Sequence, residues 1–136
     1  MSKDLIENIA PEGYQMRGVY TPAKKIDLGE AYLIFVSGVQ PHKDEDHNVT
    51  TNDIEEQTEQ VFQDISKILS AAGASLDDVV KAVIHVTNMD EFDKVSEIRA
   101  KYFQNSKPAS TLLEVKRLTR NGARIEIEVT AIVHKV

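Results

Sequence analysis

The hydrophobic residues of this chain follow two different spacings. Between residues 54 and 72 they recur every three or four positions, which predicts an amphipathic helix that ends at Gly73. Asp53, followed three positions later by a glutamate, has the pattern of a capping box at the start of this helix. A second helix is expected to begin with Asp90 as its cap and to end before Pro108.

Segments rich in β-branched and aromatic residues predict the strands. We expect strands at residues 15–20, 31–37, 79–87, 111–115 and 124–133. The segment 31–37 contains the longest purely apolar run of the chain, at 33–36, so it is expected to be buried on both faces and to pair with 15–20. The last two strands are expected to form a hairpin through residues 119–123, because Asn-Gly at 121–122 favours a tight turn. The predicted order is ββαβαββ.

The last predicted strand alternates between apolar and polar side chains. Ile125, Ile127 and Val129 fall on one face, which we expect the helices to cover, and Glu126 and Glu128 fall on the other. A sheet face that combines carboxylates with very apolar strands is awkward to leave in water. We therefore predict an α+β fold, with a mixed sheet that carries two helices on one face and whose other face meets further subunits.

Composition narrows the class of protein. A chain of 136 residues, 41% of them hydrophobic, suits a single domain over residues 1–136. The absence of cysteine excludes disulfides, thiolate nucleophiles and cysteine zinc sites, and it fits a cytoplasmic protein. No apolar run approaches the roughly 20 residues of a membrane helix, and residues 1–10 lack the pattern of a secretory signal. A net charge of −6 argues against binding to nucleic acid.

Two carboxylates are candidates for chemistry. Glu126 and Glu128 lie two apart on one strand, so their side chains project from the same face, roughly 6–7 Å apart. A carboxylate that is partly removed from water at a subunit junction can hold a water molecule and exchange protons with it. The alternative is an ordinary solvated face, which is the commoner situation for charged residues on strands.

Hydroxyl groups at the ends of strands are candidates for binding a ligand. Ser37 and Gly38 end a central strand, where the backbone turns and its polar groups are free to face a ligand. Ser110 and Thr111 begin another strand after a proline. The alternatives are plain turn chemistry and a strand-start signal, respectively. No Gly-x-Ser-x-Gly motif is present, so no activated serine nucleophile is predicted.

The histidines give no diagnostic metal spacing. His42 and His47 flank acidic residues 44–46, which we interpret as a surface loop, and His85 is expected to be packed or hydrogen-bonded within its strand. No phosphate-binding glycine motif occurs, so no nucleotide cofactor is expected. The basic residues around 116–124 have no aromatic residues among them and are interpreted as a solvated turn.

A set of characteristic segments runs through nearly the whole chain. They are Phe-Val-Ser-Gly at 35–38, the helix from Gln57 through Ala-Ala-Gly-Ala at 71–74, Asp-Val-Val-Lys at 78–81, Met-Asp-Glu-Phe at 89–92, Lys-Pro-Ala at 107–109, Glu-Val-Lys-Arg-Leu at 114–118 and Ile-Glu-Ile-Glu at 125–128. In order and spacing, these segments resemble the Rid (reactive intermediate deaminase, YjgF-type) family. The resemblance implies the chorismate mutase-like ββαβαββ fold. It also implies a homotrimer that hydrolyses small enamines and imines in three inter-subunit clefts, without metal or organic cofactor.

The resemblance also implies roles for individual residues. Glu126 corresponds to the carboxylate that activates water. The expected substrate-binding residues are Ser37, Gly38, Ser96, Ser110, Thr111 and Tyr20.

At Ser110, however, the family has an arginine that grips the substrate carboxylate. A neutral serine cannot replace that charge-assisted contact, which is worth roughly 1.5–3 kcal/mol. Lys24, Lys25 or Arg17 could supply a cation from another direction.

The first functional prediction is therefore a hydrolase, an imine or enamine deaminase with an altered substrate range. One alternative is a trimeric protein that binds a small ligand without turnover. The other is a single-strand endoribonuclease, which the acidic composition disfavours.

Overall fold

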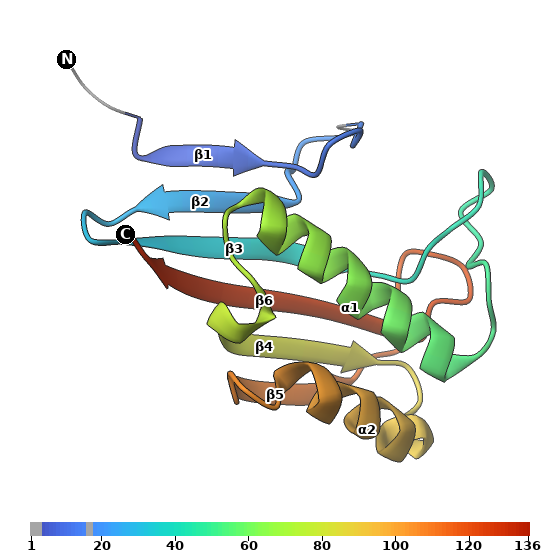
Figure 1. Ribbon diagram of the computed structural model, residues 1–136. Coiled ribbons are helices and arrows are strands. Elements are labelled where there is room, and N and C mark those ends of the chain that lie inside the picture. Colours follow the sequence, from blue (N-terminus) through green and yellow to red (C-terminus); the bar gives the residue numbers. More distant parts are fainter. Residues whose placement is uncertain (1–3, 16–17) are drawn as a thin grey trace.

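The protein forms one six-stranded sheet with two helices on one face (Figure 1). The computed structural model describes residues 4–15 and 18–136. The strands are β1 (Ile6–Ile9), β2 (Ala23–Asp27), β3 (Ala31–Val39), β4 (Val79–Val86), β5 (Ala109–Glu114) and β6 (Ile125–His134). The helices are α1 (Ile54–Ala71) and α2 (Phe92–Phe103), and the short 3₁₀ turns are η1 (Leu76–Asp78) and η2 (Met89–Glu91). The predicted α+β fold with a mixed sheet is confirmed.

The order of strands in the sheet is β1-β2-β3-β6-β4-β5. β6 pairs antiparallel with both β3 and β4, whereas β5 pairs parallel with β4 at the far edge. The predicted hairpin between the last two strands is therefore wrong, because β4 lies between them. The connection formed by residues 115–124 is long enough to cross β4. β6 then occupies the centre, where its alternating apolar residues are fully buried, and the largely exposed β5 takes the edge.

The prediction of a strand at residues 15–20 is also wrong for the residues of this segment that the structure describes. Residues 16 and 17 lie outside the described residues, and the described remainder is not in a strand. The partner of β3 is β2, with Ala23 opposite Val36, and β1 adds a further strand outside it. β2 was missed because its sequence, Ala-Lys-Lys-Ile-Asp, is too polar to stand out as a strand.

The helix starts differ in detail from the predicted caps. The Asp53 carboxylate accepts a hydrogen bond from the Glu55 amide at 2.8 Å, so Asp53 caps α1 as expected. Glu56 does not complete a capping box; its carboxylate instead accepts a hydrogen bond from the Thr51 hydroxyl. Asp90 does not cap α2, because it lies inside η2, which is capped by Asn88.

The core lies between the sheet and the two helices. Ile34 of β3, Ile127 of β6 and Phe62 of α1 are fully buried in one hydrophobic cluster. The Phe62 ring stacks on Tyr102 of α2 with 4.6 Å between centroids, which joins the two helices. Within the described residues, no helix combines the length and the apolar character needed to cross a bilayer.

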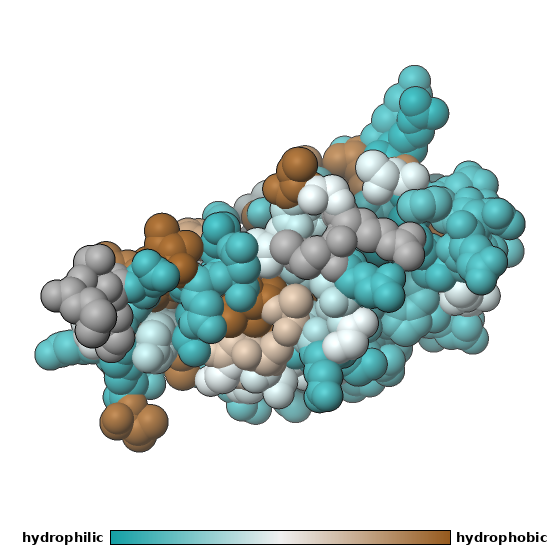
Figure 2. Space-filling model, turned by 90° about the horizontal axis from the view of Figure 1, so that it is seen from above, coloured by the Kyte–Doolittle hydropathy of each residue, from teal (hydrophilic) through white to brown (hydrophobic). Residues whose placement is uncertain are grey.

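The other face of the sheet carries exposed apolar side chains. Phe35 of β3 is 45% exposed and Ile132 of β6 is 39% exposed, and both lie on the face opposite the helices. β3 is therefore buried on one face only within a single chain, not on both as expected. Figure 2 shows the molecule from above, on the side of the β1 edge of the sheet. There, hydrophobic residues form separate patches among hydrophilic ones.

Candidate functional site

Glu126 is held on the open face of the sheet by polar neighbours. Its Oε1 accepts a hydrogen bond from Gln40 Nε2 at 3.0 Å. Across the antiparallel ladder it lies opposite His85 of β4, whose Nδ1 is 3.6 Å from Oε2. The Glu126 side chain is only 24% exposed, so the carboxylate is largely shielded from water while one side stays accessible. This is the environment in which a carboxylate can exchange protons with a bound water.

Gly38 allows the Glu126 carboxylate to lie against the backbone of β3. The pairing of β3 with β6 is irregular between Val36 and Val39, which brings Gly38 over the glutamate. A Cβ atom at Gly38 would lie 2.8 Å from Glu126 Cδ and 2.9 Å from its Oε1. Glycine is therefore required at position 38, because any larger residue would place its Cβ too close to the Glu126 side chain.

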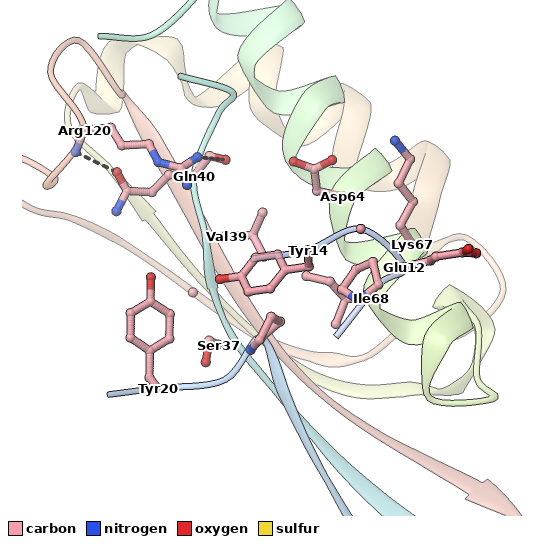
Figure 3. A pocket seen from close by; sticks show the side chains of 14 residues that line it. Glu12, Tyr14, Tyr20, Ser37, Val39, Gln40, Asp64, Lys67, Ile68 and Arg120 are labelled. Carbon is pink, nitrogen blue, oxygen red and sulfur yellow. Dashed lines mark hydrogen bonds between the residues drawn. The ribbon is translucent and has the colours of Figure 1, made fainter. Parts of the chain in front are cut away.

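Gln40 is a central residue that the sequence analysis missed. Its Nε2 donates to Thr119 Oγ1 at 2.7 Å as well as to Glu126, and its Oε1 accepts from the Arg120 amide at 3.0 Å. The Arg120 guanidinium donates to the Gln40 carbonyl, as Figure 3 shows, and also to the Pro41 carbonyl. The loop before β6 thus fixes the amide that holds Glu126. A glutamine that follows a strand carries no sequence signal for such a role.

A pocket of about 330 Å³ lies beside this group. Tyr20, Ser37 and Gly38 line it, together with Gln40 and Arg120. The rings of Tyr14 and Tyr20 stand in the pocket, and Asp64, Lys67 and Ile68 face it from α1 (Figure 3). The expected site residues Tyr20, Ser37 and Gly38 therefore meet in one pocket.

Ser37 is already engaged in a hydrogen bond. Its hydroxyl donates to the Thr21 carbonyl at 2.7 Å, which leaves the oxygen free to accept a hydrogen bond from a ligand. Since no base accepts its proton, Ser37 does not have the arrangement of an activated nucleophile.

A second hollow of about 460 Å³ shares Tyr20 and Ser37 with the first. Glu128 and Lys24 also line it, and the Glu128 side chain is exposed. Lys24 is one of the three residues that could supply a cation in place of the missing arginine, and it lines this hollow. The Lys25 amine lies 4.2 Å from the centre of the Tyr32 ring, and Arg17 lies outside the described residues.

The remaining expected residues lie in another part of the chain. Ser96 is on α2, where its hydroxyl accepts a hydrogen bond from Arg99 at 3.1 Å. Ser110 and Thr111 are on β5, with β4 between them and β6. None of the three lines either hollow beside Glu126. Within one chain, the expected site therefore separates into two groups.

The acidic loop near His42 is in contact with α1. His42 Nε2 lies 3.1 Å from the nearer carboxylate oxygen of Asp64, which contacts the pocket from α1. His47 lies at the tip of the loop with a φ of 65°. Across residues 4–15 and 18–136, no three histidine, aspartate or glutamate side chains come together as a possible metal site.

Comparisons with known proteins place the chain in a family. The profile of the family described as Endoribonuclease L-PSP matches residues 15–133. The chain therefore belongs to the Endoribonuclease L-PSP family. The part of the chain that matches the family includes every site residue expected from the sequence.

Similar proteins agree with this assignment. The chain is 39% identical over 118 residues to a RutC family protein of Pyrococcus abyssi, covering 87% of each. It is 32% identical to the 2-iminobutanoate/2-iminopropanoate deaminase of Mus musculus, covering 85% of this chain and 82% of the relative. A crystal structure of a Rid family protein from Yersinia pestis superposes with a TM-score of 0.80 at 34% identity, covering 93% of this chain and 98% of that one. The resemblance to the Rid family is thereby confirmed.

Proposed function

We propose that this protein hydrolyses a small reactive imine or enamine to a carbonyl compound and ammonia. The observation that carries the proposal is the Glu126 carboxylate, which is shielded from water, held by Gln40 and set beside a pocket lined by Tyr20 and Ser37. The similarity to the mouse 2-iminobutanoate/2-iminopropanoate deaminase supports the reaction class.

In the proposed reaction, Glu126 activates the attacking water. The carboxylate accepts a proton from water as the water oxygen bonds to the imine carbon, and it passes that proton to the nitrogen, which gives a neutral carbinolamine. Glu126 then accepts the proton of the carbinolamine hydroxyl and passes it to the nitrogen, so that the carbonyl forms as the carbon–nitrogen bond breaks and ammonia leaves. The bond from Gln40 to Oε1 holds the carboxylate in one orientation, which favours proton transfer along a fixed line.

The complete site is proposed to form between subunits of a homotrimer. Two separated groups of site residues, one around Glu126 and one around Ser110, fit a cleft to which neighbouring chains contribute one group each. The exposed apolar residues of the open sheet face, such as Phe35, fit a surface that is covered by association. Light scattering at micromolar concentration should give three chain masses, and a single chain mass would contradict the proposal.

The substrate range is proposed to differ from that of relatives with an arginine at position 110. Ser110 is neutral and exposed, so it offers no charge-assisted fork to a carboxylate. Imines of 2-keto acids should therefore be poor substrates. Imines without a carboxylate next to the reacting carbon should be preferred.

Ammonia release from a panel of imines, with and without the carboxylate, tests the proposal. Glu126→Gln should abolish release and leave the melting temperature nearly unchanged, because the amide keeps the shape but cannot take a proton. Glu128→Gln is the matched control, since Glu128 shares the strand and the face, whereas the hydrogen bond from Gln40 goes to Glu126. Activity of Glu126→Gln close to the wild type would remove Glu126 from the reaction.

A protein that binds a small ligand without turnover is the second candidate. The absence of an arginine at position 110 favours it, because catalysis depends on holding the substrate in register more than binding does. Binding of panel compounds without release of ammonia would support this candidate. If the wild type cleaves single-stranded RNA and the Glu126→Gln variant cleaves it equally well, the result would instead support the endoribonuclease activity named in the family description.

A further inference from the structure

His85 has a buried ring nitrogen that lies close to the Glu126 carboxylate. Its Nδ1 is inaccessible to solvent and has no hydrogen-bond partner among the described residues. The ring lies opposite Glu126 in the ladder between β4 and β6, with Nδ1 3.6 Å from Oε2. Buried polar atoms are rarely left unpaired, because a buried donor or acceptor without a partner has lost its hydrogen bonds to water and gained none in return.

The chemistry of the two groups selects one arrangement. An ionised carboxylate only accepts hydrogen bonds, so a neutral imidazole satisfies it when the proton is on Nδ1. The separation of 3.6 Å is a few tenths of an ångström beyond hydrogen-bond length. Contacts of catalytic groups are often long without substrate and tighten when it binds. A decrease of a few tenths of an ångström would bring this contact within hydrogen-bond length.

We propose that His85 is a positioning residue that donates a hydrogen bond from Nδ1 to Oε2 of Glu126. The inference rests on the proposed function of Glu126 as the group that activates water. Gln40 holds Oε1 from the β3 side and His85 holds Oε2 from the β4 side, so the carboxylate is fixed between two neutral donors. The proton-accepting lone pairs that remain then face the accessible side of the site.

Two substitutions at position 85 separate positioning from packing. His85→Phe keeps an aromatic ring of similar size but removes the donor, and His85→Asn restores an amide nitrogen near the place of Nδ1. We expect His85→Phe to lower kcat by about ten- to a hundredfold with KM changed less than about twofold. His85→Asn should recover kcat to within about threefold of the wild type. His134→Phe is the matched control, because His134 is exposed near the end of β6, far from Glu126, and should leave kcat unchanged.

Two kinetic results overturn the inference. One is a kcat for His85→Phe within twofold of the wild type. The other is an equal loss in the phenylalanine and asparagine variants with a matching loss of melting temperature, since that pattern shows a packing role.

A measurement without substrate keeps the inference testable if the proposed function itself fails. Nitrogen NMR shifts of the His85 ring, at a pH where the ring is neutral, should show the proton on Nδ1 in the wild type. In Glu126→Leu the proton should shift toward Nε2, because the acceptor is gone. The same tautomer in both proteins overturns the hydrogen bond. Failure of the whole imine panel with the expected tautomer change contradicts the proposed reaction and leaves the His85–Glu126 contact standing.

Discussion

Replacing Gly38 by alanine should displace the Glu126 carboxylate. The added Cβ would lie 2.8 Å from Glu126 Cδ, whereas carbon atoms pack at about 3.5–4.0 Å, so the carboxylate must move by roughly 0.7–1.2 Å. A shift of that size breaks the 3.0 Å hydrogen bond from Gln40. A misplacement of about 1 Å costs on the order of a hundredfold in rate, and overpacking costs about 1–3 kcal/mol of stability.

The assay is kcat for ammonia release from the best substrate of the imine panel, together with denaturant unfolding at one fixed protein concentration. Gly29→Ala is the matched control. Its Cβ would meet no atom within 4 Å, but its φ is 98°, so alanine there should lose about 1–3 kcal/mol through backbone strain and leave kcat unchanged. Retention of more than half of wild-type kcat by Gly38→Ala, with a folded protein, would refute the argument that close packing positions Glu126.

Three further predictions concern recognition and stability. Ser110→Arg should raise kcat/KM for 2-iminopropionate by roughly ten- to a hundredfold, about 1.4–2.7 kcal/mol of regained binding, and a wild type as fast as arginine-bearing relatives would contradict it. Gln57→Met should lower the free energy of unfolding by about 2–4 kcal/mol in urea titrations, because Gln57 is fully buried and makes three hydrogen bonds; exposed Gln63→Met is the control. Burial and the hydrogen bond to Glu59 raise the pKa of Tyr102 from 10.0 to about 12. Unfolding measured against pH should therefore show a stability contribution that is complete below pH 10 and is lost between pH 10 and about 12, a loss absent from Tyr102→Phe.

Local patterns in the sequence determined most of the elements. The three- to four-residue spacing before Gly73 predicted α1, because one apolar stripe must face a core wherever the chain goes. The period of two in β6 placed Glu126 and Glu128 on the face opposite Ile127, as the structure has them. β2 was missed because its second and third residues are lysines, and a segment this polar forms a strand only through the neighbouring strands that pair with it.

Tertiary structure alone decided which strands are neighbours and which side chains meet. Nothing in the local sequence required β4 to lie between β5 and β6, because a long connection permits either arrangement and only the burial of β6 selects one. The contacts around Glu126 bring together Gly38, Gln40 and His85 from distant parts of the chain. Residues that meet only through sheet pairing leave no period or spacing in the sequence. The sequence could therefore predict Glu126 as a candidate for chemistry, and only the fold showed which neighbours hold its carboxylate.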